Sequence, residues 1–270
     1  METERLFLSL LDDHESGSSQ LLRKCIDWLN TALESGEDPE DIHAQLEQLC
    51  QQHSSMALLS NLNQFLHKVS LNAGRIRAWY DMVLKHESAA CILFAEHLGG
   101  FKNVLVHSNS GLLARSLENV KTPLNIFCTE SRPAFEGRIL AERLSGLGHR
   151  VCLITDMAAF SVLPRIEVLA LGCDSITPRG VVNKIGTSAL AAAAADLGRK
   201  CYVVGTSEKW IDVWHQEFLL RQGPSKEVYD GLAAIHVENY YFDLTPLELI
   251  NGIFIETGMA QMIYEKAASH

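Results

Sequence analysis

The chain has 270 residues, of which 47% are hydrophobic, enough to bury a sizeable core and to predict two domains. Its 33 acidic and 23 basic side chains give a net charge of -10 with histidine neutral. This balance argues against a nucleic-acid-binding protein, because nonspecific binding to phosphate backbones depends on lysine and arginine. We expect no direct nucleic-acid partner.

The seven cysteines are scattered through apolar runs and form no CxxC pair, so the sequence suggests neither a zinc site nor a disulfide framework. Reduced, buried thiols are typical of cytoplasmic proteins, and we expect that localisation. The acidic amino terminus lacks a signal-peptide core, and no apolar run approaches the ~20 residues of a membrane span. The sequence thus predicts no membrane association, no bound metal and no cofactor.

Residues 1–98 are predicted to form a helical domain, because their apolar residues recur at helical spacing and strand signals are scarce. Asp38 followed by Pro39 is typical of a helix start, with an N-cap and a first-turn proline. The expected helices cover 22–33, 39–49, 58–69, 76–86 and a stretch that starts near Ser88.

From Gly99-Gly100 onward, short apolar runs alternate with helical stretches, and we place a second domain at residues 99–270. The runs are continuous rather than alternating, which is typical of strands buried on both faces. Alternating strands and helices predict an α/β fold with a doubly wound, mostly parallel sheet. The expected strands are 104–106, 124–128, 151–154, 168–171 and 201–204, and the expected helices are 111–119, 134–146, 157–163 and 186–197.

The last third of the chain is harder to interpret. Segment 206–245 is rich in aromatic residues and is expected to be a lid or a dimer surface. Thr245-Pro246 with Glu248 predicts a capped helix start, and the tail from Gly258 predicts a last short helix.

The loops after parallel strands meet at one edge of such a sheet, where open α/β folds build their ligand crevice. The loop after the first strand carries small polar residues and opens the next helix at its anion-attracting end. An ordinary capped turn is the alternative. The ligand-binding candidates here are His107, Asn109, Ser110 and Gly111, which surround Ser108.

Charged residues follow the next three strands. Glu130 and Arg132 would orient a polar ligand or form a structural ion pair, in either case with Arg138 nearby. Asp156 is expected to cap the helix that follows it. Asp174 ends the fourth expected strand, where we expect it to be buried at the crevice. Because burial raises the pKa of a carboxyl group, Asp174 is the candidate general acid/base.

The segment from Gly180 to Thr187 supplies the remaining candidates. Asn183 and Lys184 are either ligand-binding or structural, and the lysine offers a point charge suited to phosphate. Gly186 and Thr187 open an alanine-rich helix at its anion-attracting end, although no Walker A loop is present. Together these residues describe a site for a small phosphorylated ligand.

Three segments carry a family resemblance: ESRPAFEGRILAERLSGLGHRVCLITD, LGCDSITPRGVVNKIGTSALA and DLTPLELI. They closely resemble the superfamily that joins the alpha, beta and delta subunits of eukaryotic translation initiation factor 2B with methylthioribose-1-phosphate and ribose-1,5-bisphosphate isomerases. The resemblance covers residues 100–258. It implies a helical amino-terminal domain, a Rossmann-like carboxyl-terminal domain and usually a dimer.

In the isomerases a cysteine and an aspartate drive an aldose-to-ketose conversion of a ribose 1-phosphate. The resemblance places that aspartate on Asp174 and the neighbouring Asn-Lys of the substrate site on Asn183 and Lys184. The cysteine falls on Ser108, whose hydroxyl is far less acidic than a thiol with its pKa near ~8.5. The arginine of the isomerases' Arg-Gly-Ala phosphate loop is also missing from its nearest counterpart, Ser16-Gly17-Ser18.

Three hypotheses follow. The first is an initiation-factor-2B-like protein that binds a sugar phosphate or a nucleotide phosphate as a sensor or regulatory subunit. The second is an aldose–ketose isomerase in which Asp174 is the acid/base and Ser108 or a water replaces the thiol. The third is an interaction module without a ligand. The expected partners are a phosphorylated small molecule and further copies of the chain or related subunits.

Overall fold

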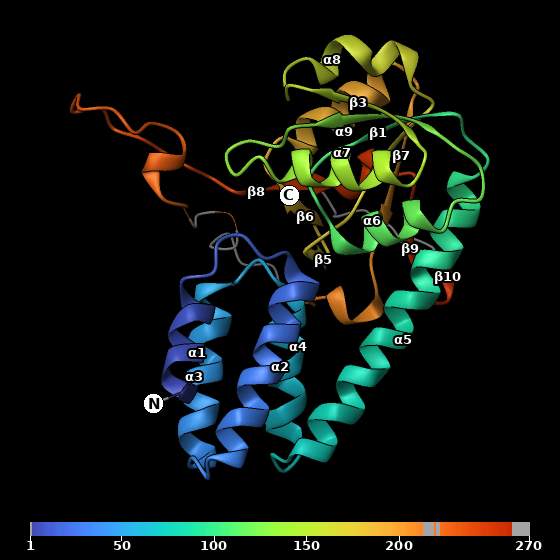
Figure 1. The fold of residues 1–270 in the computed structure, drawn as a ribbon. Helices are drawn as coiled ribbons and strands as arrows, with labels where there is room; N and C mark the ends of the chain where they lie inside the picture. Colours follow the sequence, from blue (N-terminus) through green and yellow to red (C-terminus); the bar gives the residue numbers. More distant parts are fainter. Residues whose placement is uncertain (1, 213–218, 220–221, 261–270) are drawn as a thin grey trace, which may run out of the picture.

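The computed structural model describes residues 2–212, 219 and 222–260. The α/β class expected from the sequence is confirmed, with a helical amino-terminal region followed by a mostly parallel sheet (Figure 1). The first helices are α1 (Glu2–Leu11), α2 (Ser18–Glu34), α3 (Pro39–Gln52), α4 (Ala57–Lys68) and α5 (Ala73–Leu98).

The amino-terminal helices pack side by side around one apolar core. Trp28 and Leu29 on α2 are fully buried in this core, together with Leu62 on α4. The start of α3 follows the expected pattern, because the Asp38 side chain accepts a hydrogen bond from the N–H of Glu40 at 2.8 Å and Pro39 is the first helical residue.

Helix α5 replaces the two helices that the sequence predicted over 76–86 and from Ser88. It is one helix of 26 residues, since no glycine, proline or cap interrupts the chain at this point. Ile76 and Val83 belong to the helical core, whereas Phe94 and Leu98 pack on the sheet. The domain division at residue 98 stays a prediction, and α5 contributes to the cores on both sides of it.

The main sheet has seven strands in the order β10-β9-β7-β4-β1-β2-β3, and every pairing is parallel except that of β10 with β9. The order turns back at β1 and β4, which is the doubly wound pattern whose crevice lies at the carboxyl ends of those strands. The strands are β1 (Asn103–Val106), β2 (Asn125–Thr129), β3 (Arg150–Ile154), β4 (Val168–Leu171), β7 (Lys200–Val204), β9 (Gly252–Ile255) and β10 (Gly258–Ala260).

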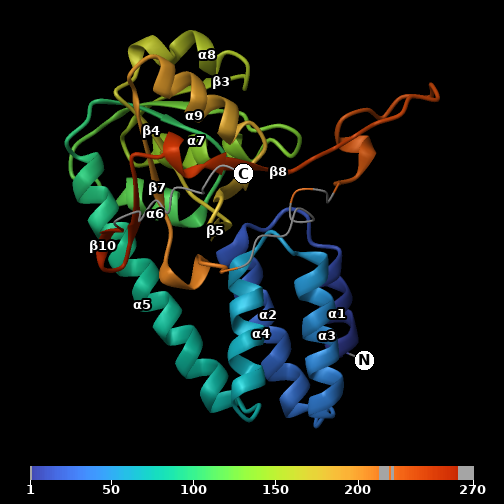
Figure 2. The ribbon, with the colours of Figure 1, turned by 180° about the vertical axis from the view of Figure 1, so that it is seen from behind.

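Helices cover both faces of this sheet (Figures 1 and 2). Val104 and Val106 face the core made with α5, α6 and α7, whereas Leu105 between them faces the core made with α8 and α9. The expected burial on both faces is therefore found at β1, but not at the edge strand β3, where Cys152 and Leu153 are exposed. The helices of this region are α6 (Gly111–Glu118), α7 (Glu136–Gly146), α8 (Ala159–Val162) and α9 (Thr187–Asp196).

A second, three-stranded sheet was not expected from the sequence. It consists of β5 (Ser175–Thr177), β6 (Gly180–Lys184) and β8 (Phe242–Pro246), all antiparallel. The predicted helix start at Thr245-Pro246 is wrong, because these residues pair with Val181 and Gly180 and only a short 3₁₀ helix, η5 (Leu247–Leu249), follows. Long-range pairing outweighs the local capping pattern here.

The segments beyond β7 and β9 also differ from expectation. Residues 258–260 form strand β10 rather than a helix, and the rest of the predicted tail helix lies outside the described residues. Part of the predicted lid or dimer surface, residues 213–218 and 220–221, lies outside them as well. Residues 222–241 run out from the body as an arm in both views, and Leu232 on it is fully exposed (Figures 1 and 2).

All seven cysteines are free thiols, and Cys152 is the exposed one. Among the residues that the structure describes, no helix is both long and apolar enough to cross a bilayer.

The contact between β2 and α7 gives a stability prediction. A Cβ atom added at Gly137 would lie 1.9 Å from the carbonyl oxygen of Thr129, whereas one added at Gly146, at the other end of α7, would meet nothing within 4 Å. We expect Gly137→Ala to lower the free energy of unfolding by about 1–3 kcal/mol or more through overpacking. Gly146→Ala is the matched control and should leave it unchanged or slightly raised.

Urea denaturation followed by circular dichroism measures both variants. Equal stabilities would contradict the close approach of the two backbones.

Candidate functional site

The predicted crevice residues lie at the carboxyl ends of β1 and β4 and on the second sheet, and the loop before α2 approaches them from the helical bundle. The loop after β1 and the end of β4 touch, because a Cβ atom at Gly172 would lie 2.1 Å from the hydroxyl oxygen of Ser110. On the bundle side, a Cβ atom at Gly17 would lie 4.0 Å from the carbonyl oxygen of Asn109. The backbones of three segments far apart in sequence therefore meet here.

His107 is a structural link in the structure. Its ring is 1% exposed, with Nδ1 2.8 Å from the Thr129 hydroxyl and Nε2 2.9 Å from the Ile185 carbonyl oxygen. Because a carbonyl only accepts, Nε2 carries the proton and Nδ1 accepts from the threonine. Burial lowers the pKa of His107, so the ring is neutral and ties β1, β2 and the turn before α9 together.

Ser108 has a left-handed backbone, with φ at 69°, which is uncommon for a residue with a side chain. Its N–H donates to the hydroxyl of Ser131 at 2.9 Å, and Ser131 and Phe135 also have positive φ. Strained backbones of this kind cluster at functional sites. The Ser108 hydroxyl donates to Glu136 Oε1 at 3.1 Å.

Glu136, the first residue of α7, is an unpredicted member of the site. Its Oε1 also lies 2.8 Å from Lys184 Nζ, and its Oε2 is buried without a hydrogen-bond partner among the described residues. Lys184 is 8% exposed, and its ammonium lies 4.9 Å from the centre of the Tyr241 ring. The cation expected to bind phosphate is thus paired with a carboxylate of the chain itself.

Glu130 and Arg132 do not pair with each other. Glu130 binds Arg138 at 2.7 Å, and the guanidinium groups of Arg132 and Arg138 lie against the ring of Phe135 at 4.5 and 3.9 Å. The ion-pair alternative therefore holds for Glu130 with Arg138 rather than with Arg132.

Asp156 is not the helix cap that the sequence predicted. Its two carboxylate oxygens accept from the N–H groups of Ser131 and Arg132, each at 2.7 Å, and α8 starts at Ala159 without a side-chain cap. The loop after β2 presents two adjacent N–H groups to this carboxylate, and this bidentate contact holds the loop in place.

Asp174 follows β4 and sits at the boundary with the bundle. Burial raises its pKa, although the charges of Lys209 and Lys184 and hydrogen bonds from Ser18 act in the opposite direction. Its backbone oxygen accepts from the N–H of Ala57, the first residue of α4, at 3.2 Å. The candidate acid therefore lies at the amino ends of two bundle helices.

Lys209 was not singled out in the sequence, although it is one of the cations beside Asp174. It belongs to the 3₁₀ helix η2 (Ser207–Lys209) after β7 and is 1% exposed. Its Nζ donates to the hydroxyl of Ser18 at 2.9 Å and to the carbonyl oxygen of Cys173 at 2.5 Å. This buried cation joins the sheet to the start of α2.

The start of α9 is already occupied by a carboxylate. Asp243 Oδ2 accepts from the N–H groups of Gly186 at 2.8 Å and Ser188 at 3.1 Å, so the anion expected at this helix end is part of the chain. Asn183 donates to the hydroxyl of Thr187 at 3.1 Å, and both side chains are buried. These contacts favour the structural alternative for Asn183.

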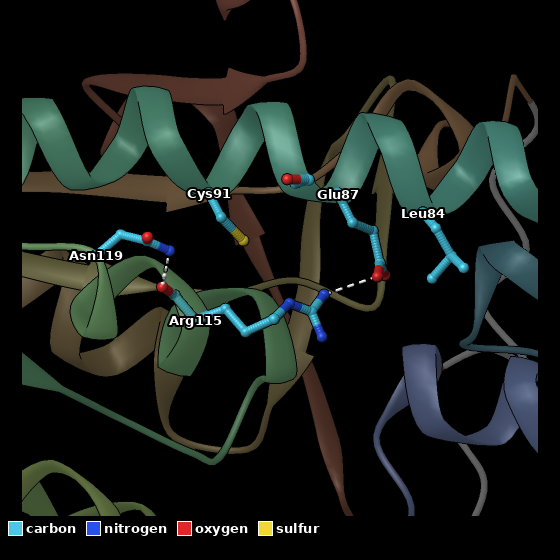
Figure 3. Close-up of a pocket in the computed structure, with 6 residues that line it drawn as sticks. Leu84, Glu87, Cys91, Arg115 and Asn119 are labelled. Carbon is cyan, nitrogen blue, oxygen red and sulfur yellow. Dashed lines mark hydrogen bonds and ion pairs between the residues drawn. The ribbon is translucent and has the colours of Figure 1, made fainter.

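The start of α6 differs, because its N-cap residue Ser110 makes no side-chain capping bond. Toward the other end of α6, a pocket of about 260 Å³ lies between α5 and α6 (Figure 3). There Glu87 is 4% exposed and lies 2.6 Å from Arg115, and it also accepts from the hydroxyl of Ser19 on α2. This contact holds α2 and α6 against α5. The pocket is lined by Leu84, Glu87, Ser88, Cys91, Arg115 and Asn119.

The residues that sequence reasoning missed share one property: each belongs to a segment whose partner is distant in the chain. Glu136 lies in one of the segments that carry the family resemblance, and its position at a helix start was the available signal. Asp243 also lies in such a segment, DLTPLELI, but it belongs to β8, a strand that was not predicted. Lys209 follows the predicted strand β7, and no local pattern marks it as a site residue.

These features define a class of protein: a helical bundle joined to a doubly wound sheet, with buried charged side chains where the strand ends meet the bundle. Residues 16–262 match the family model described as the initiation factor 2 subunit family, and the chain belongs to this family. The resemblance expected from the sequence is confirmed.

Several relatives are named as sugar-phosphate isomerases. A methylthioribose-1-phosphate isomerase of Trichoplax adhaerens is 33% identical over 58% of this chain and 49% of that protein. A ribose 1,5-bisphosphate isomerase of Methanocaldococcus jannaschii is 30% identical over 58% and 54%, and a 5-deoxyribose 1-phosphate isomerase of Moorella thermoacetica is 29% identical over 71% and 64%. The chain thus spans about half to two thirds of the length of these relatives.

Solved structures agree on the fold. The translation initiation factor eIF-2B of Pyrococcus horikoshii OT3 superposes with a TM-score of 0.85 at 23% identity, covering 96% of each chain. A 5-methylthioribose 1-phosphate isomerase of the same organism has a TM-score of 0.73 at 20% identity, over 96% of this chain and 84% of that one.

Asp243 gives a prediction for the dependence of stability on pH. Burial raises its pKa from 3.8 to about 6, although the N–H groups of Ser188 and Gly186 lower it. The pKa of Asp243 is higher in the folded protein, about 6, than the ordinary value of 3.8 expected in the unfolded chain. The protonated carboxyl therefore stabilises the fold fully below pH 3.8, and this contribution is lost as pH rises through about 6. We expect the stability of the wild type relative to Asp243→Asn to fall by on the order of 2 kcal/mol across this window.

Urea denaturation at intervals between pH 4 and 7 measures the difference. Asp196→Asn, at the exposed end of α9, controls for the loss of one carboxylate. A constant gap between wild type and Asp243→Asn would show that Asp243 titrates normally.

Proposed function

We propose that the protein binds a phosphorylated sugar or nucleotide in this crevice, as an initiation-factor-2B-like sensor or regulatory subunit. The observation that carries the proposal is the placement of Asp174, a partly buried acid within electrostatic reach of Lys184 and Lys209. An acid beside cations suits a ligand with hydroxyl groups at one end and a phosphate at the other, since carboxylates accept from hydroxyls and ammonium groups bind phosphate.

Two further features support a phosphate at the Lys184 end. The start of α6 at Ser110 and Gly111 lacks a side-chain cap, which leaves it suited to an anion. The named relatives act on pentose 1-phosphates. Asp174, Asn183 and Lys184 lie on a segment that resembles the isomerases. We infer that a pentose 1-phosphate is the ligand class to test first.

Glu136 bears directly on affinity, because its carboxylate holds Lys184 Nζ at 2.8 Å. A phosphate at the lysine would have to displace this carboxylate or accept its repulsion. The same carboxylate accepts from Ser108, so the crevice side chains are coupled through it.

Calorimetry with 5-deoxyribose 1-phosphate, ribose 1,5-bisphosphate and adenosine monophosphate tests the proposal. We expect Lys184→Gln to weaken binding at least tenfold and Glu136→Gln to tighten it several-fold, because the second change removes the negative charge that competes with phosphate. Lys121→Gln, on an exposed lysine before β2, should change nothing.

Lys184→Gln alone leaves a buried carboxylate unpaired, so the double variant Glu136→Gln/Lys184→Gln separates lost binding from lost folding. If none of the three ligands binds the wild type or Glu136→Gln, the binding proposal is wrong and the interaction module without a ligand is favoured.

The second candidate function is an aldose–ketose isomerase, and the raised pKa of Asp174 favours it. A carboxyl whose pKa is raised by burial is better suited to general acid/base work than one with the ordinary pKa. In this role Asp174 would move the proton between carbon and oxygen atoms of the sugar. Ser108 would stand where the isomerases have a thiol, with Glu136 as the acceptor for its hydroxyl proton.

A coupled assay on 5-deoxyribose 1-phosphate decides between binding and turnover. If the protein is an isomerase, we expect Asp174→Asn to lower kcat by about 10²–10⁴-fold and Ser108→Cys to raise it. Turnover that survives Asp174→Asn unchanged would exclude the mechanism. Absence of turnover in the wild type, with binding retained, would support the sensor.

We further propose that the protein is cytoplasmic and assembles as a homodimer or with related subunits. The free thiols support the first point. The second is supported by the exposed Leu232 and Ile235 on the projecting arm and by the fold shared with the tetrameric eIF2B beta and delta complex of Chaetomium thermophilum, with a TM-score of 0.68 at 14% identity.

A further inference from the structure

A second group of ionisable side chains lies away from the predicted crevice residues, where α5 meets the ends of β7 and β9. His86 comes from α5, Glu208 from η2 and Glu256 from the turn after β9. His86 Nδ1 is 2.6 Å from Glu208 Oε1 and 4.0 Å from Glu256 Oε1. One potential ligand atom from each of the three residues lies within 4.8 Å of the other two.

Glu208 is the unusual member of the group. Its side chain is 9% exposed, and its Oε1 accepts from His86 and from the hydroxyl of Ser207 at 3.2 Å. Its Oε2 is buried and has no hydrogen-bond partner within the described part of the chain. A buried carboxylate oxygen without a donor is costly, and such an atom indicates a missing water or ion.

The surroundings hold the Glu256 side chain and the backbone of Glu208 in place. Glu256 Oε2 accepts from the N–H of Ser207 at 3.1 Å, which leaves Oε1 toward His86. The backbone oxygen of Glu208 accepts from the Asn61 amide on α4 at 2.6 Å, so η2 is fixed to the bundle. Ligands held by outer hydrogen bonds in this way are typical of metal sites.

We propose that His86, Glu208 and Glu256 bind one divalent transition-metal ion, for which Zn²⁺ is the probe. One imidazole nitrogen and two carboxylates suit Zn²⁺ and its first-row neighbours, whereas Mg²⁺ and Ca²⁺ prefer all-oxygen ligand sets. Three protein ligands leave a fourth position for water. The ion takes the place of the hydrogen bond between His86 and Glu208 and supplies the partner that Oε2 lacks.

The ion would act through structure, because Glu208 directly precedes Lys209. That lysine contacts Ser18 and the Cys173 carbonyl oxygen beside Asp174. A metal that binds α5 to η2 therefore fixes the buried cation of the crevice. The metal site does not rest on the proposed function, since it makes no assumption about a crevice ligand.

Calorimetric titration of the full chain with Zn²⁺, after chelator treatment and dialysis, tests the site. We expect one equivalent to bind, and His86→Ala and Glu208→Gln each to weaken that binding at least tenfold. His67→Ala is the matched control, since His67 on α4 is half exposed and lies 3.3 Å from Glu47 on the surface, and it should leave the titration unchanged.

Co²⁺ in place of Zn²⁺ distinguishes this site from the cysteines, because its absorption spectrum should lack the charge-transfer bands of thiolate ligands. Circular dichroism of the metal-free variants shows that they fold. Binding that is absent from the wild type, or that persists unchanged in folded His86→Ala and Glu208→Gln, overturns the proposal.

Discussion

The crevice depends on one constraint: a single helix, α5, packs half its length in the bundle and half on the sheet. An uninterrupted helix is stiff, so it fixes the distance between the two cores. Polar contacts then fill the junction from both sides. Ala57 donates to the backbone of Asp174, Lys209 reaches Ser18, and Glu87 holds Arg115 and Ser19. The bundle therefore contributes contacts to the site residues, and the strand ends alone would not hold Asp174 and Lys209 in place.

Carboxylates of the chain itself already bind several of the positively charged groups and helix amino ends in this region. Asp243 takes the amino end of α9, and Glu136 takes Lys184. Asp174 lies at the amino end of α2, where Ser18 is its hydrogen-bond donor. Because Glu136 already pairs with Lys184, an anion bound under the proposed function would compete with Glu136 for the lysine. The proposed affinity for phosphate would then be a difference between two similar attractions, which would make it sensitive to single substitutions at Glu136.

The sequence predicts what is encoded locally. Continuous apolar runs gave the core strands β1, β2, β4 and β7, and Asp38-Pro39 located the start of α3. The loop at His107 and the acid Asp174 were placed at strand ends by the same pattern, and both lie there. The predictions that failed concern residues whose partners are distant in the chain. Thr245-Pro246 carries the sequence signal of a helix start but pairs with β6. Asp156 caps no helix because its carboxylate accepts from two N–H groups of the loop after β2. The cluster of His86, Glu208 and Glu256 spans 170 residues and leaves no spacing to recognise.

The backbone at Ser108 has a consequence for how such proteins diverge. Its left-handed φ and the hydrogen bond that its N–H donates to the Ser131 hydroxyl involve only the main chain of residue 108, so they do not depend on the atom attached to its Cβ. Oxygen or sulfur at this position would lie in nearly the same place, against the same carboxylate. Under the proposed function, exchanging this one atom would therefore change the chemistry at residue 108 without a rearrangement of the chain around it.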